Sequence, residues 1–133
     1  MNLHTLNVWA ILAASVSAFV IGGLWYSPVL LGGAWKRANG FVSDPPAAGA
    51  RGFLIAFVLS LVMAVNLAMF LNAPGTTTAF GATAGFLAGA GWVAAGMGIV
   101  AVFEHRSWKY VLIHGGYLTV ALTVMGAILG GWR

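Results

Sequence analysis

The sequence predicts an all-α membrane protein whose four transmembrane helices pack as a bundle. Only 6% of its 133 residues are charged and 61% are hydrophobic, whereas a soluble chain carries about 25% charged residues. The six basic and two acidic residues also leave three long stretches free of charge: residues 1–35, 52–103 and 110–132. So few charges cannot cover the surface of a soluble domain, and the length suits a single domain.

The charge-free stretches divide into four spans. A transmembrane helix needs about 20 apolar residues, so the first stretch holds one span, residues 6–31. The second is long enough for two, and the turn-forming residues 72–78 separate span 53–71 from span 80–103. The third stretch is one span, residues 110–132. The segments are continuously apolar rather than alternating, which favours helices over the strands of a membrane barrel.

The end of the first span contains a proline and is followed by a segment of mixed apolar and basic residues. Pro28 removes a helical N–H and predicts a kink or an end near Tyr26 and Ser27. Residues 29–39 are typical of a short interfacial segment, with apolar side chains for the lipid and basic ones for the headgroups. The N-terminus lacks the basic region of a signal peptide, so the first span is expected to be retained.

Small residues recur at intervals of four in every span. Such rows allow the close backbone contact that drives helix association in lipid. The rows indicate either packing within one bundle or docking of further chains, as a homo-oligomer or with other membrane subunits. Four rows in four helices favour at least one that faces another chain. The packing residues are Ala14, Ala18 and Gly22 in the first span, Gly81, Gly85 and Gly89 in the third, and Gly126 and Gly130 in the fourth.

The distribution of basic residues predicts the orientation. The loop between the first two spans carries Lys36, Arg37 and Arg51, and the loop between the last two carries Arg106 and Lys109. The other side has only Arg133. Basic loops stay in the cytoplasm, so both termini are expected on the non-cytoplasmic side. Lys36, Arg37 and Arg51 are predicted to lie near anionic headgroups, either as ordinary anchors or as a specific lipid site.

A cluster of polar and aromatic residues is predicted at the cytoplasmic mouth. The Glu–His pair could move protons near neutral pH or bind a metal, although no recognised ligand spacing is present. The simpler interpretation is an interfacial ion pair beside a hydrogen-bonded packing histidine. The cluster comprises Tyr26, Ser27, Glu104, Arg106, Lys109, His114 and Tyr117.

A few polar residues lie within the spans. Asn66, Thr119 and Thr123 either bond across helices as structural glue or line a polar path through an oligomer. Trp92 is the one tryptophan deep inside a span, whereas the others mark the interfaces. Its indole N–H needs a hydrogen-bond partner or a wet cavity.

The composition argues against an enzyme. With one Asp, one Glu and no Cys, most hydrolase and transferase mechanisms lack their parts. No catalytic residue, cofactor site or metal site is assigned. The sequence pI near 10.2 comes from few charges at one membrane face and does not indicate nucleic acid. The first prediction is a non-enzymatic membrane protein that acts through helix packing. The alternatives are a small oligomeric transporter or channel, and a lipid or hydrophobic-ligand binder.

Short motifs along nearly the whole chain carry a family resemblance. They are residues 24–28 (LWYSP) with Trp35, residues 103–107 (FEHRS), Tyr117 with its preceding glycine, and residues 125–130 (MGAILG). Together they resemble the bacterial membrane-protein family catalogued as domain of unknown function 1761. The resemblance implies four spans in a bacterial inner membrane and no established activity. An Asn is common in that family where this chain has His114, which argues against a conserved catalytic role for that residue and still allows a hydrogen-bonding one.

Overall fold

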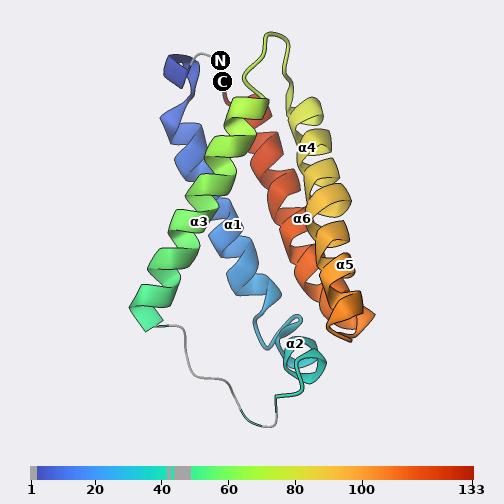
Figure 1. The fold of residues 1–133 in the computed structure, drawn as a ribbon. Helices are drawn as coiled ribbons and strands as arrows, with labels where there is room; N and C mark the ends of the chain where they lie inside the picture. The colour runs from blue at the N-terminus through green and yellow to red at the C-terminus, as the bar shows by residue number, and fades with distance from the viewer. Residues whose placement is uncertain (1–2, 42, 44–48) are drawn as a thin grey trace.

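Four long helices run the length of the molecule in the computed structural model, which describes residues 3–41, 43 and 49–133 (Figure 1). They are α1 (Val8–Trp25), α3 (Gly49–Phe70), the continuous helix Thr78–Phe103, and α6 (Trp108–Gly131). The third comprises α4 (Thr78–Leu87), a π-helical segment (Ala88–Ala94) and α5 (Ala95–Phe103). Each is long and apolar enough to span a membrane. The described residues contain no strand, so the predicted fold class is confirmed.

The first span is shorter than predicted, and the chain then reverses. The helix α1 ends at Trp25 rather than near residue 31. The N–H groups of Leu31 and Gly32 turn back to the carbonyls of Trp25 and Ser27, at 3.0 and 2.9 Å. A Cβ at Gly32 would lie 2.7 Å from the Tyr26 carbonyl oxygen, so only glycine fits there. The turn leads into the short helix α2 (Gly32–Ala38), which packs against α6.

Polar side chains cap the starts of α1, α4 and α6. Thr77 accepts a hydrogen bond from the Phe80 N–H at 3.1 Å, and Ser107 accepts one from the Tyr110 N–H at 3.3 Å. Asn7 caps α1 in the same way through the N–H of Trp9 at 3.0 Å. These caps satisfy backbone donors that the first turn leaves free. They begin α4 and α6 two residues before the predicted spans.

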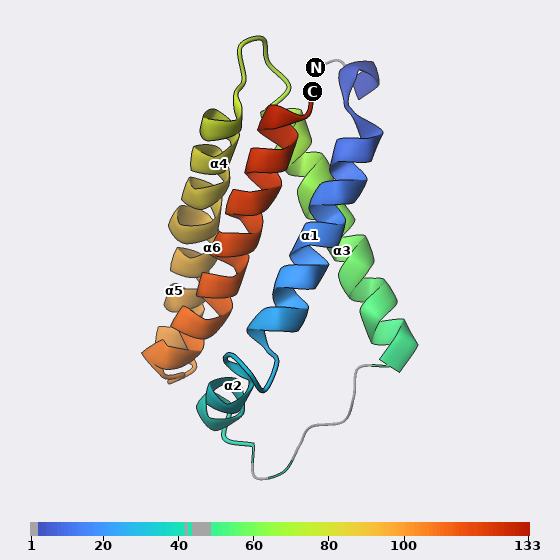
Figure 2. The same cartoon turned by 180° about the vertical axis from the view of Figure 1, so that it is seen from behind.

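Small residues bring the third and fourth spans into backbone contact (Figure 2). A Cβ added to Gly81 would overlap the carbonyl oxygen of Gly126, and one added to Gly126 would overlap that of Gly81. Gly85 meets the Leu122 carbonyl in the same way, and Gly130 meets that of Thr77. The two glycine rows therefore face each other within the chain, as close packing in lipid requires.

The other two rows are also used mainly inside the bundle. Ala14 and Ala18 of α1 are buried, and Gly22 lies against the Tyr117 hydroxyl, 3.1 Å from an added Cβ. On α3, Ala64 and Ala68 are buried. Packing within one bundle thus accounts for the packing residues predicted in the first, third and fourth spans.

The π-helical segment keeps the third span in register with α6. Five residues of the third span face α6, namely Gly81, Gly85, Gly89, Ala94 and Gly98. A Cβ added to Gly115 lies 2.7 Å from the Ala94 Cβ. The interval is four residues everywhere except between Gly89 and Ala94, where it is five. A π turn closes over five residues, so it absorbs the extra one.

The helix α3 leaves one side of the bundle open. It packs on α1 and, to a lesser extent, on α6, but it makes little contact with α4, the π segment or α5. Figures 1 and 2 show it crossing α1 at an angle, with its N-terminal half leaning away from the other helices. Its buried residues run from Ser60 to Ala68, whereas Ala56 is exposed. A gap therefore separates α3 from α4.

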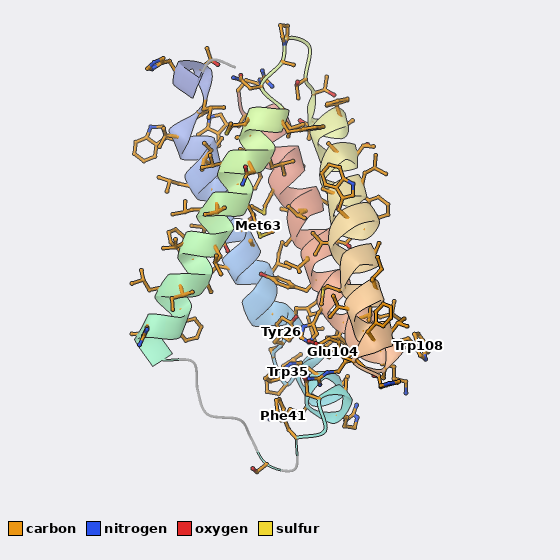
Figure 3. All side chains as sticks on the ribbon, viewed as in Figure 1. Tyr26, Trp35, Phe41, Met63, Glu104 and Trp108 are labelled. Carbon is orange, nitrogen blue, oxygen red and sulfur yellow. The ribbon has the colours of Figure 1, made fainter. Side chains whose placement is uncertain are left out.

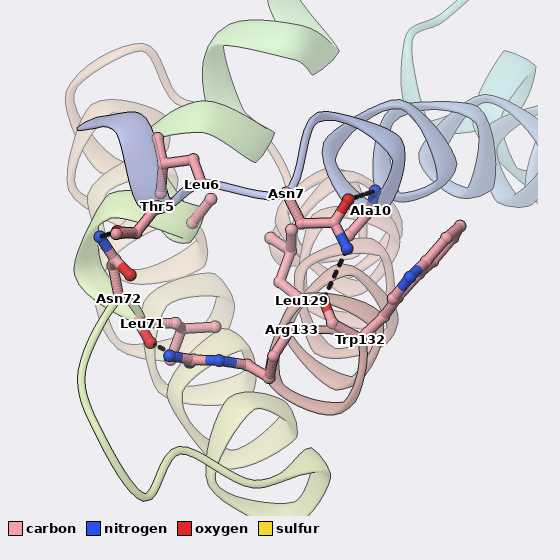
Figure 4. A pocket seen from close by; sticks show the side chains of 10 residues that line it. Thr5, Leu6, Asn7, Ala10, Leu71, Asn72, Leu129, Trp132 and Arg133 are labelled. Atoms are coloured by element: carbon pink, nitrogen blue, oxygen red, sulfur yellow. Dashed lines mark hydrogen bonds between the residues drawn. The ribbon is translucent and has the colours of Figure 1, made fainter. Parts of the chain in front are cut away.

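The two chain ends meet at one end of the bundle, opposite α2 (Figures 1 and 4). The Arg133 guanidinium donates to the carbonyls of Leu71 and Ala73, at 2.6 and 3.0 Å. Asn72 donates to the Thr5 hydroxyl at 2.7 Å. A small pocket of about 30 Å³ lies between these groups. They join the ends of α1, α3 and α6, and the two basic loops lie together at the opposite end.

Candidate functional site

An aromatic and imidazole cluster lies at the end of the bundle that carries α2. The Tyr26 hydroxyl and His114 Nδ1 are 2.6 Å apart. The Tyr26 ring packs against the rings of Trp35 and Tyr117, with centroids 5.8 and 5.5 Å away. Tyr110 stacks edge-on to His114 at 4.5 Å. Figure 3 shows Tyr26 and Trp35 at this end of the bundle. The structure brings together Tyr26, His114 and Tyr117, three members of the polar cluster that the sequence predicts.

Two long-range hydrogen bonds fix this cluster to the helices. The Trp25 indole N–H donates to the Ile113 carbonyl at 2.8 Å. The Tyr117 hydroxyl donates to the Ala18 carbonyl at 3.0 Å. Both connect α1 to α6, so the cluster also ties the start of the Tyr26 turn to the fourth span. The aromatic residues supply ring area for packing and polar atoms for these bonds.

The remaining members of the predicted cluster lie at its rim. Arg106 stands over the Tyr110 ring at 5.2 Å and 3.8 Å from the Glu104 carboxylate. Lys109 is exposed. The Ser27 hydroxyl donates to the Leu24 carbonyl of its own turn, at 2.7 Å. The ion pair is exposed and of little energetic weight, while the Arg106–Tyr110 contact connects it to the half-buried rings.

The Tyr26 phenol is held in its neutral form. Burial raises its pKa well above the ordinary value, and the nearby phenols of Tyr117 and Tyr110 raise it further. A neutral phenol carries a hydrogen that it can donate to an imidazole nitrogen. The cluster is therefore a set of hydrogen-bonded rings. Within the described residues, no three His, Asp or Glu side chains come together in a way that would hold a metal ion.

A groove of about 710 Å³ lies between α3 and the third span. One wall comes from α3, the other from α4 and the π segment, and α6 forms the floor. Figure 3 shows Met63 directed from α3 into this space. The lining includes Met63, Asn66, Leu67 and Phe70 of α3, then Phe80, Thr83, Leu87 and Trp92 of the third span, and Leu118 and Leu122 of α6. The volume falls in the range of binding pockets, about 300–1,000 Å³.

The polar residues predicted to form a path do not come together. Asn66 lines the groove, and the one hydrogen bond that the described residues give it runs to the Val62 carbonyl of its own helix, at 2.9 Å. Thr119 and Thr123 instead lie where α6 meets Gly89 and Gly85. The Thr123 hydroxyl donates to the Thr119 carbonyl at 2.7 Å. The two threonines are packed between helices, apart from the groove.

Trp92 belongs to the groove rather than to the cluster. It sits in the π-helical segment, lines the groove, and is 74% exposed within the chain. No described residue hydrogen-bonds to its indole N–H. The sequence predicted that Trp92 lies deep within a span. It did not predict which residues surround Trp92, because they depend on the tilt of α3 and on the π-helical segment.

Residues 9–130 match the family described as Protein of unknown function (DUF1761). The chain belongs to this family. The DUF1761 match covers both the aromatic cluster and the groove, and it confirms the resemblance drawn from the sequence motifs. Three of those motifs converge in space: Trp25, Tyr26, Trp35 and Tyr117 form the cluster, with Glu104 and Arg106 at its rim. The fourth, residues 125–130, packs against α4 instead. No curated protein and no solved structure matches the chain.

Proposed function

We propose that this multi-pass membrane protein is non-enzymatic and acts through helix packing, as a homo-oligomer or as an accessory subunit of a membrane complex. The observation that carries the proposal is the groove between α3 and the third span. The small-residue rows are used within the bundle, so the groove is the surface that remains for a further helix.

The walls of the groove have the spacing of a helix-packing surface. On α3 the lining residues are Met63, Asn66, Leu67 and Phe70, and on α4 they are Phe80, Thr83, Ala84 and Leu87. In both sets the lining residues are spaced three or four positions apart. Residues with this spacing form a stripe along one face of a helix, which can pack against a neighbouring helix. A transmembrane helix fits such a pair of stripes as a further member of a bundle.

Filling the groove tests the proposal. Thr83→Trp adds a large side chain in the groove wall, and Val102→Trp adds the same side chain at an outward position on the same span, where the valine is 70% exposed. We expect wild type and Val102→Trp to form the same assembly in lipid nanodiscs, measured by light scattering and by co-purification from membranes. Thr83→Trp should lose it. A wild-type chain that is monomeric and co-purifies with no membrane protein would refute the proposal.

The proposal includes an orientation in a bacterial inner membrane. Both termini lie on the non-cytoplasmic side, and Lys36, Arg37 and Arg51 contact anionic headgroups. The support is the number of basic residues at the α2 end of the bundle and the preference of such residues for the cytoplasmic side.

Single cysteines test this orientation cleanly because the chain has none of its own. Ala73→Cys lies in the loop between α3 and α4, and Lys109→Cys lies in the first turn of α6 at the opposite end of the bundle. We expect an impermeant maleimide to label Ala73→Cys in intact cells and Lys109→Cys only after permeabilisation. The reverse pattern would overturn the orientation. Replacing Lys36 and Arg37 with glutamine should lower the anionic lipid that remains bound after purification.

A further inference from the structure

We infer that the α2 end of the bundle binds one anionic phospholipid that carries two phosphates. One phosphate lies beside Arg37, and the other lies beside Arg106 and Lys109. The inference rests on the proposed function, and it narrows the proposed headgroup contact to one class of lipid.

This end of the molecule carries more positive than negative charge. Its five basic side chains come from α2, from the start of α3 and from residues 106–109, and Glu104 is the only acidic residue that the structure describes there. The Glu104 carboxylate lies 3.8 Å from Arg106, so it offsets one of these charges. No described carboxylate pairs with Arg37, Arg51 or Lys109. Basic surfaces between membrane helices on the cytoplasmic side are typical sites for headgroups with several phosphate charges.

The guanidinium of Arg37 lies over the first turn of α2. Its Nη1 atom is 3.3 Å from the Cβ that Gly33 would carry, and nothing else lies within 4 Å of that position. The neighbouring Gly32 packs on the carbonyls of Tyr26 and Ser27. Because Arg37 is exposed, its guanidinium is open to a ligand beside the turn that joins α1 to α2. A guanidinium binds phosphate through two parallel hydrogen bonds.

Arg106 and Lys109 lie on the other side of the aromatic cluster. Arg106 stands over the Tyr110 ring at 5.2 Å, and that ring is 4.5 Å from the ring of His114. The Nδ1 atom of His114 in turn lies 2.6 Å from the Tyr26 hydroxyl. Lys109 is exposed in the first turn of α6. Both groups of basic residues are therefore held on one packed cluster.

Tyr26 separates the two groups. Its carbonyl oxygen is 2.7 Å from the Cβ that Gly32 would carry, on the side of Arg37. Its hydroxyl meets His114, on the side of Arg106. The length of a tyrosine side chain therefore lies between them, which one phosphate does not span. Two phosphates joined through one glycerol take one place each, and the second then binds intramolecularly, which raises the affinity.

Exposed apolar residues beside the cluster favour a lipid over a soluble polyphosphate. Val29 is 90% exposed and Leu30 is 57% exposed, and both lie in the turn that precedes α2. Such side chains enter the acyl region of a bilayer while basic neighbours reach the headgroups. A lipid therefore satisfies the apolar turn and the basic side chains together.

Native mass spectrometry of the purified chain tests the inference by counting lipids bound from mixed detergent micelles. The probes are tetraoleoyl cardiolipin, which has two phosphates, and dioleoyl phosphatidylglycerol, which has one. We expect cardiolipin to reach half-saturation at an about tenfold lower concentration of phosphate, because its second phosphate is tethered to the first.

Three variants locate the two phosphates. Arg37→Gln, and Arg106→Gln combined with Lys109→Gln, should each remove the preference for cardiolipin. Arg51→Gln is the matched control and should keep it, because Arg51 lies in the N-terminal half of α3, which leans away from the other helices (Figures 1 and 2). All four side chains are exposed, so unfolding of the variants in sodium dodecyl sulfate should match that of the wild type.

Equal binding of the two lipids at equal phosphate would overturn the inference and leave the proposed function intact. A preference that survives either of the first two variants, or that Arg51→Gln removes, would also overturn it. If neither lipid binds, the proposed headgroup contact fails as well.

Discussion

The contact between α4 and α6 should make Gly85 intolerant of a single added methyl group. In Gly85→Ala, the new Cβ would overlap the Leu122 carbonyl oxygen and lie 2.6 Å from its carbon and 3.0 Å from the Thr123 Cα. All three atoms belong to the backbone, so no side-chain rotation relieves the overlap. Ordinary contact begins at 3.4 Å. The Leu122 carbon alone therefore requires a separation of about 0.8 Å, and the nearer carbonyl oxygen requires more.

A separation of this size has a predictable cost. It loosens the contacts that Gly81 and Gly126 make one turn away. Overpacking of a tight core costs about 1–3 kcal/mol, and we expect Gly85→Ala to lower the free energy of unfolding by that amount. Gly96→Ala is the matched control, because nothing lies within 4 Å of its Cβ. Alanine in place of glycine within a helix is favourable by about 0.5–1 kcal/mol.

Unfolding by sodium dodecyl sulfate in mixed micelles, followed by circular dichroism, measures both variants against the wild type. We expect the transition of Gly85→Ala at a lower detergent fraction and that of Gly96→Ala at an equal or higher one. If both variants shift by the same amount, the direct backbone contact between the glycine rows is not what holds the third and fourth spans together.

Three further predictions use the same assay. Tyr26→Phe removes the hydrogen bond to His114 and should cost about 0.5–1.5 kcal/mol, whereas Tyr110→Phe, whose hydroxyl bonds to no described residue, should cost less. Arg133→Gln removes the guanidinium from the carbonyls of Leu71 and Ala73 and should cost about 1–2 kcal/mol; unchanged unfolding would show that this bridge is not needed. Because burial raises the pKa of Tyr26 in the folded chain, the contribution of Tyr26 to stability should be constant below about pH 10, the ordinary tyrosine pKa, and fall above it. Tyr26→Phe should reduce that fall, and phenolate absorbance should show fewer tyrosines ionising near pH 10 in the folded chain than in the unfolded chain.

The spans were predictable because charge is excluded from them. The gaps between Arg51 and Glu104 and between Lys109 and Arg133 are physical requirements of the bilayer, so the helices had to lie there. The gathering of Tyr26, His114 and Tyr117 was predictable for a related reason. Residues close to the same interface lie at one depth, whichever way each helix turns.

The rotation of each helix about its axis and the tilt of the helices were harder to predict. Thr119 and Asn66 are both polar residues within apolar spans, yet one lies under Gly89 and the other lines the groove. The difference depends on which face each helix turns inward, and glycine and alanine are so frequent that several faces look alike. The lean of α3 has no local cause in the sequence, because it arises from packing on α1. The groove was therefore beyond prediction.

Because of the π turn, the third span could lose one residue and still pack against α6. Removing one residue between Gly89 and Ala94 would turn the five-residue interval into a four-residue one, and an ordinary α-helix would then keep every small residue facing α6. The packing on α6 thus requires only six of the seven residues of Ala88–Ala94. A shortened chain that still folds but no longer engages its partner would separate two tasks within a single helix. One is to hold the protein together, and the other is to present Trp92.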